Sequence, residues 1–290
     1  MCDFTNGNLY FYKNFHIETN YKNIFNQIRR VLSRPMAWET VMRTRFSKGY
    51  RISNFVTPTL ISNGDLMILS TLDSDQAFAL QIDCISSNSD NNNNQDSMKS
   101  NSNNVEPFLY IQSAILYTHS DGTRRIRVHN TCLPIVNRLI DVFEGIDGEC
   151  LSTFFLKSTI DKIFKSKKMS NSILHFSSMT KNMMSAALSA QHSLKKEVPQ
   201  NLVSFILYIL GALKNRVLCK DEIERKLDVD LSNYMRIKLQ KLSTFDVQSF
   251  VYPRIYPLQS VLENTNIGVF NEDNSYCELP QVNIKIKIIR

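Results

Sequence analysis

The sequence has little glycine and none of the short motifs that mark the common enzyme classes. Only 8 of its 290 residues are glycine, and it contains no P-loop, no G-x-G-x-x-G, no H-E-x-x-H and no G-x-S-x-G. The five histidines lie in different predicted elements, and none stands near a serine or cysteine nucleophile in a familiar arrangement. The sequence therefore predicts a binding protein and not an enzyme.

The sequence also lacks closely spaced cysteines. No C-x-x-C pair occurs, and no histidine lies at metal-ligand spacing, which argues against zinc or redox chemistry. We expect no cofactor and no metal in this chain, and we expect its thiols to be buried and reduced. The six thiols are those of Cys2, Cys84, Cys132, Cys150, Cys219 and Cys277.

Long apolar runs and strong charge blocks are missing too. The longest apolar run, residues 201–213, spans about 13 residues where a membrane helix needs about 20, so it predicts a buried helix. Residues 1–12 lack the charged and apolar regions of a secretory signal. The 34 Lys and Arg exceed the 27 Asp and Glu, and the net charge of +7 mildly favours anionic partners.

One alternating segment and several short β-rich segments within residues 36–134 predict an antiparallel β-sandwich. Side chains alternate across a strand, so the segment 36–47 has two distinct faces. We expect one face to hold Met36, Trp38, Met42 and Phe46, and the other to hold Glu39, Val41, Arg43 and Arg45. Further strand patterns cover residues 51–61, 65–72, 76–85, 107–118 and 124–131, the last two joined by an Asp-Gly turn.

The second half of the chain changes to a helical period. After Pro134, apolar residues recur at helical spacing in segments 136–143, 154–164, 173–194, 202–218 and 235–242. The same period occurs earlier, from Ile24 to Leu32, after a strand-like aromatic stretch at residues 9–15. Residues 86–105 hold almost no apolar side chains, so we expect a disordered insertion. The predicted fold class is α+β, a β-sandwich followed by an all-helical domain.

Arginines concentrate on two of the predicted strands. Arg43 and Arg45 stand two residues apart and share a strand face, and so do Arg125 and Arg127. Two guanidinium groups about 7 Å apart suit the acidic end of a peptide, because each fork binds a carboxylate in bidentate fashion. The alternative is that these arginines pair with nearby carboxylates or cover apolar surface. We favour that alternative for Arg125 and Arg127, which form a candidate basic surface.

Four segments together resemble the cargo-selecting subunits of the COPII vesicle coat. They are GNLYFYKNFH (7–16), ETVMRTRFSKGYRISNF (39–55), IQSAILYTHSDGTRRIRVHNTCLPI (111–135) and FVYPRIYPL (250–258), collinear over about residues 15–258. The resemblance implies that residues 1–35 end a trunk domain, 36–134 form the β-sandwich, 135–250 form the helical domain, and 251–290 lead into a gelsolin-like domain. The insertion at 86–105 is not a family feature, and the family's zinc-finger domain is absent from this sequence.

The resemblance also implies a function and a site. In this family, acidic-hydrophobic sorting signals in cytosolic cargo tails bind a pocket of the β-sandwich, whose residues correspond here to Arg43, Arg45 and Leu116. The implied partners are the GTPase-activating sister subunit, the coat small GTPase, cargo tails and, by peripheral contact, the anionic membrane of the endoplasmic reticulum, but no nucleic acid. The implied location is cytoplasmic, on exit-site membranes and coated vesicles.

Two other functions stay open from the sequence. The sister subunit shares the RRIRV segment, so regulation of the coat GTPase by an arginine supplied in trans is one alternative. The HNTCLPI that follows RRIRV here favours the cargo subunit. Arginines near Trp38 and Tyr117 suggest a single-stranded nucleic-acid binder as the other alternative, although the charge excess is modest.

Overall fold

The computed structural model describes most of the chain between residues 5 and 278. The predicted insertion at 86–105 and most of the segment 251–290 lie outside the described residues. Those described are 5–56, 60–62, 64–85, 107–166, 169–190, 198–218, 228–252, 268–270 and 276–278.

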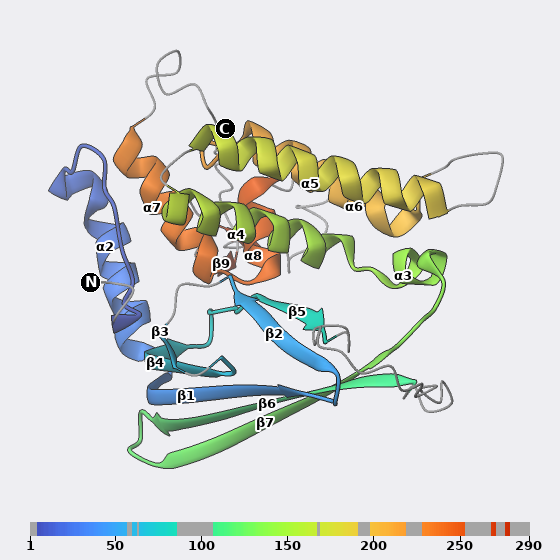
Figure 1. Cartoon of the computed structure of the whole chain (residues 1–290). Helices are drawn as coiled ribbons and strands as arrows, with labels where there is room; N and C mark the ends of the chain where they lie inside the picture. Colours follow the sequence, from blue (N-terminus) through green and yellow to red (C-terminus); the bar gives the residue numbers. More distant parts are fainter. Residues whose placement is uncertain are drawn as a thin grey trace.

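Two antiparallel sheets form the first part of the molecule. The larger sheet has the strand order β3-β4-β1-β6-β7, and the smaller one pairs β2 with β5. Figure 1 shows the small sheet between the large sheet and the helices. The strands are β1 (Met36–Phe46), β2 (Tyr50–Phe55), β3 (Leu60–Ser62), β4 (Leu66–Asp73), β5 (Leu80–Cys84), β6 (Phe108–His119) and β7 (Arg124–Pro134).

The sandwich core is small and lies over β1 and β4. Met42, Phe55, Met67 and Leu69 are its buried members, because the two strands of the small sheet cover only this part of the large one. β7 is left at the edge, and all 11 of its residues are exposed. The predicted hairpin between β6 and β7 is confirmed, and Gly122 takes the positive φ of +85° in its turn.

The predicted alternation of β1 holds in its second half and fails at Trp38. Thr40, Met42 and Thr44 are buried, whereas Arg43 and Arg45 are exposed. Trp38, which we expected on the buried face with Met42, is 47% exposed. The reason is a β-bulge: the register with β6 shifts between Trp38 and Val41, and Glu39 has a φ of +47°.

The helices of the second part bury one large apolar core, which confirms the sandwich-then-helices fold class. Phe176, Phe205 and Ile160 are completely buried in it. The apolar run 201–213 forms a helix that buries Phe205 and Ile209, as predicted, and no helix in the described residues is long and apolar enough to cross a membrane. The helices are α3 (Leu139–Gly145), α4 (Gly148–Ser166), α5 (Met169–Ala190), the 3-10 helix η1 (Gln200–Leu202), α6 (Val203–Lys214), α7 (Val229–Lys241) and α8 (Thr244–Val251).

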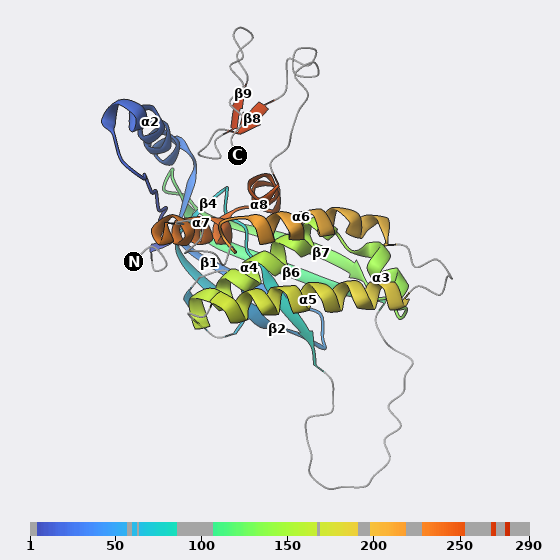
Figure 2. The ribbon, with the colours of Figure 1, turned by 90° about the horizontal axis from the view of Figure 1, so that it is seen from above.

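A further helix, α2 (Ile17–Ser33), lies to one side of both parts (Figure 2). It ends before Pro35, as the sequence predicted, but the strand expected at residues 9–15 is wrong, because that segment has no regular structure. Arg34, which follows α2, donates to Asp73 and Asp75 at 2.6 and 2.8 Å and ties the helix to the end of β4. A short strand pair, β8 (Gly268–Phe270) and β9 (Tyr276–Glu278), completes the described structure.

Candidate functional site

The outer face of the large sheet carries the predicted site residues. Strand register places Arg43 opposite Ala114 and Arg45 opposite Gln112 on β6. Leu116 lies opposite Val41 on the same face, one diagonal step from Arg43. The structure therefore brings Arg43, Arg45 and Leu116 onto one face, which is the face opposite to buried Met42. We call this surface the outer face of β1.

Arg43 already has a carboxylate partner. Its Nε donates to Asp65 Oδ2 at 2.6 Å, and both side chains are well exposed, at 47% and 36%. An exposed ion pair of this kind contributes about 0–1 kcal/mol, so a ligand carboxylate can compete with Asp65 at little cost. Asp65 was not among the residues that the sequence analysis singled out.

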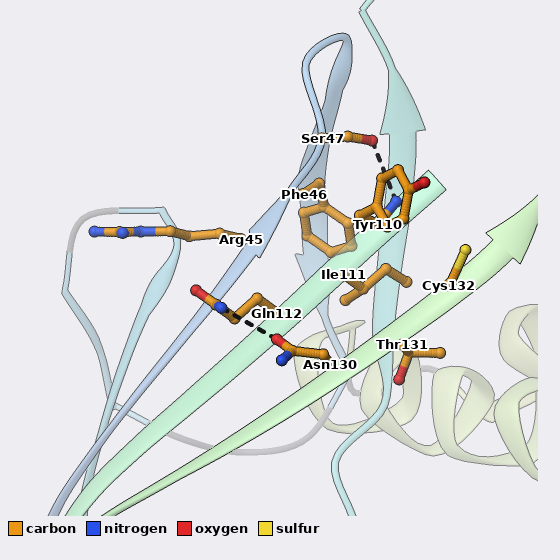
Figure 3. Close-up of a pocket in the computed structure, with 9 residues that line it drawn as sticks. All are labelled: Arg45, Phe46, Ser47, Tyr110, Ile111, Gln112, Asn130, Thr131 and Cys132. Carbon is orange, nitrogen blue, oxygen red and sulfur yellow. Dashed lines mark hydrogen bonds between the residues drawn. The ribbon is translucent and has the colours of Figure 1, made fainter. Parts of the chain in front are cut away.

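Arg45 forms no hydrogen bond or ion pair with the part of the chain that the structure describes. It lines an open cleft of about 530 Å³ at the ends of β1, β6 and β7. Figure 3 shows the Arg45 side chain extending away from the rings of Phe46 and Tyr110. Adjacent residues of a strand point to opposite faces, so the guanidinium group of Arg45 and the ring of Phe46 lie on opposite sides of the sheet at this cleft. The guanidinium group is therefore open to an acidic ligand group on the outer face. Its lining residues are Arg45, Phe46, Ser47, Tyr110, Ile111, Gln112, Asn130, Thr131 and Cys132.

Two polar contacts join the chain segments that line this cleft. Gln112 Nε2 donates to Asn130 Oδ1 at 3.1 Å, across the pair β6–β7 (Figure 3). The backbone N–H of Tyr110 donates to Ser47 Oγ at 3.4 Å. Of the three predicted site residues, Arg45 lines the cleft, whereas Leu116 and Arg43 do not. The three residues therefore cover a longer surface, and the cleft lies at the Arg45 end of it. Gln112 and Asn130 become visible as neighbours only once the pairing of the three strands is known.

Arg125 and Arg127 lie on the other face of the large sheet. Arg127 is paired with Ile115, which packs against the sandwich core. Arg125 donates to Thr123 Oγ1 at 2.9 Å and pairs with Asp121. Hydrogen bonds from Thr123 hold the pKa of Asp121 well below its usual range, so this carboxylate stays charged beside Arg125. The local pairing makes Arg125 a poor candidate for binding a ligand.

The prediction that the thiols are buried is wrong for three of them. Cys84, Cys132 and Cys150 are free and exposed, because β5 ends at Cys84, β7 is uncovered, and Cys150 lies in the first turn of α4. The other three cysteine side chains lie outside the described part. Among the described residues, no three His, Cys, Asp or Glu side chains gather into a group that could hold a metal ion.

The chain is similar in sequence to known transport proteins. Residues 37–136 match the model of the Sec23/Sec24 beta-sandwich domain. The chain is 27% identical over 282 residues to human protein transport protein Sec24B, covering 93% of this chain and 20% of that protein. It is 30% identical over 273 residues to human Sec24A, covering 91% and 23%. It is 27% identical over 274 residues to SEC24 of Dictyostelium discoideum, covering 89% and 25%.

A solved structure shares the fold. The crystal structure of the human COPII-coat protein Sec24c superposes with a TM-score of 0.73 at 22% identity, over 87% of this chain and 30% of that one. The chain therefore spans between a fifth and a quarter of the length of these curated relatives.

Proposed function

We propose, because the chain belongs to the Sec24 family, that it acts as a cargo-binding part of the COPII vesicle coat. In this proposal it binds acidic-hydrophobic sorting signals in the cytosolic tails of membrane cargo and makes or breaks no covalent bond. The observation that carries the proposal is Arg45, an arginine on the central strand of the sheet, exposed and without a partner in the described residues.

The spacing of the outer face defines the kind of peptide that fits. Along β1, Arg45 lies four residues beyond Val41, the strand partner of Leu116, which corresponds to about 13 Å. Arg45 would take the acidic group, with Arg43 released from Asp65 as a second clamp. Leu116 is half-buried between Val41 and exposed Ile126, and it would form the apolar wall. An extended peptide spans that distance with an acidic and an apolar residue about four positions apart.

The remaining family assignments belong to the same proposal. The partners would be the GTPase-activating sister subunit, the coat small GTPase and the anionic membrane of the endoplasmic reticulum, which the net charge of +7 favours. The location would be cytoplasmic, on exit-site membranes and vesicles. The trunk assignment of residues 1–35 and the gelsolin-like assignment of residues 251–290 also stay predictions.

Substitution of Arg45 tests the proposed binding of an acidic group. We expect Arg45→Glu to weaken binding of a fluorescent peptide with an acidic-hydrophobic signal by about 10- to 100-fold, because a charge-assisted hydrogen bond contributes about 1.5–3 kcal/mol. Fluorescence anisotropy measures the Kd. Arg43→Glu should have a smaller effect, since Arg43 is already engaged by Asp65.

The matched control is Arg125→Glu, which makes the same charge change on the opposite face. Equal losses in Arg45→Glu and Arg125→Glu would mean that the peptide follows net charge and not the outer face of β1. Absence of binding by the unaltered chain contradicts the proposal for this chain. Displacement of the peptide by single-stranded polynucleotide, or stimulated GTP hydrolysis by the coat GTPase, would favour one of the two alternative functions.

A further inference from the structure

A buried lysine stands where the sandwich meets the helical domain. Lys157 belongs to α4 and is only 2% exposed. Its Nζ donates to the carbonyl oxygen of Leu242 at 2.7 Å and to that of Ala77 at 3.2 Å. Leu242 directly follows α7, whereas Ala77 lies between β4 and β5 of the sandwich. One side chain therefore bonds both domains.

The same point of the sandwich is bonded a second time. The backbone N–H of Ala77 donates to the carbonyl oxygen of Lys241 at 2.9 Å, so both polar backbone groups of Ala77 are bonded to the helical domain. Lys241 Nζ in turn donates to the Gly7 carbonyl at 2.7 Å. The neighbouring Asn6 side chain donates to Thr71 and Gln76 at 2.6 and 2.8 Å. Three parts of the chain thus meet around Ala77.

In the described residues, no single cluster of buried apolar side chains spans the boundary. The buried core of the sandwich and the buried core of the helical domain are separate clusters that share no residue. When two domains have separate cores, their relative position depends on the polar contacts at the boundary. Lys157 supplies two of these contacts from a buried position.

The charge of Lys157 is held by carbonyl groups. No carboxylate in the described residues pairs with it, since Asp73 and Asp75 bind Arg34, and Asp246 accepts from Ser243. The Leu242 carbonyl lies at the C-terminal end of α7, where the helix dipole favours a cation. A lysine is suited to this place because it carries three donors on a long apolar stem.

We propose that Lys157 is a positioning residue that fixes the helical domain on the sandwich, so that the two domains open and unfold as one cooperative unit. Without its two hydrogen bonds, Ala77 and Leu242 keep partly buried carbonyl groups that lose the Lys157 donor, and the boundary becomes the weakest part of the molecule. The sandwich, whose buried core is small, would then open separately from the helices.

The test compares Lys157→Met with Lys165→Met in the full chain. Lys165 lies on the same helix but its side chain is 62% exposed, and it pairs with Asp161 on that helix, so it controls for the loss of a lysine. Hydrogen exchange should show the amide of Ala77 exchanging at least 10-fold faster in Lys157→Met and unchanged in Lys165→Met. Thermal unfolding followed by far-UV and near-UV circular dichroism should separate into two transitions in Lys157→Met alone. A single transition with unchanged Ala77 exchange overturns the proposal.

The unaltered chain supplies a second test if Lys157→Met does not fold. In low concentrations of urea, the amides of Ala77 and of Phe205, in the middle of the helical core, should exchange through the same opening, with the same dependence on denaturant. If the Ala77 amide exchanges through a separate, less stable opening in the unaltered chain, Lys157 does not join the domains into one unit.

Discussion

Phe205→Ala is expected to lower the free energy of unfolding by about 3–5 kcal/mol, the cost of removing a completely buried aromatic ring from a packed core. Phe205 has no exposed surface, and its ring meets that of Phe155 edge-on, with centroids 5.7 Å apart. It also lies where α4 approaches α6 closely: a Cβ added at Gly148 would come within 3.3 Å of the Phe205 Cβ. The site has little freedom to collapse around the lost ring.

Urea denaturation followed by circular dichroism measures this loss. Leu210→Ala is the matched control, because Leu210 lies on the same helix but is 50% exposed. We expect Leu210→Ala to lower the free energy of unfolding by less than about 1.5 kcal/mol, because half of the Leu210 side chain stays in contact with water in the folded protein. Similar losses at both positions would mean that α6 does not present the Phe205 side of the helix to the core.

The second large effect is a pH dependence that belongs to Lys157. Burial lowers the pKa of Lys157 to about 8 from its ordinary value of 10.5. Between these two values the unfolded chain binds more protons than the folded chain, so folding stability rises with pH in this window. The difference corresponds to roughly 3 kcal/mol, gained as pH increases from about 8 to 10.5 and absent below pH 8.

The measurement is urea denaturation of the unaltered chain and of Lys157→Met at several pH values from 7 to 10.5. Other groups titrate in this range, but they are shared by the two proteins, so the difference between the two curves isolates Lys157. We expect the unaltered chain to gain stability relative to Lys157→Met as pH rises. Parallel curves would show that folding does not lower the pKa of Lys157.

The sequence predicted those elements whose pattern is local. Alternation predicted β1, and short β-rich segments between turn residues predicted the strands after it, although the segment 51–61, expected as one strand, forms β2 and β3 in two different sheets. The Asp-Gly pair predicted the turn between β6 and β7. Helical spacing predicted α3 to α7. Helical spacing missed α8, which has only eight residues. A helix-capping signal was present in the sequence, because Ser243 is followed three residues later by Asp246. In the structure the Asp246 backbone N–H donates to the Ser243 hydroxyl at 3.3 Å.

The remaining features depend on contacts between distant residues. Nothing local marks Glu39 for a positive φ, because the bulge arises from the pairing of β1 with β6, about 75 residues later. The apolar period of residues 24–32 correctly predicted the helix α2. It could not show that the apolar side of this helix is uncovered, and Phe25 and Leu32 are exposed at 53% and 80%. The cleft beside Arg45 likewise depends on three strands meeting at one end. Sequence reasoning could identify Arg45 but not Gln112 and Asn130 as its neighbours.

The exposed edge strand β7 also has a consequence for the behaviour of the protein in solution. A free edge can recruit the same strand of another molecule, and β7 offers apolar Ile126 and Val128 for such a contact. Arg127, which forms no ion pair within the described residues, opposes it by charge repulsion between two copies, whereas Arg124 and Arg125 pair with Glu39 and Asp121. This repulsion is screened over about 10 Å at 0.1 M salt and over about 3 Å at 1 M. We therefore expect edge-to-edge association of the chain to increase between 0.1 M and 1 M salt, which light scattering at the two salt concentrations measures.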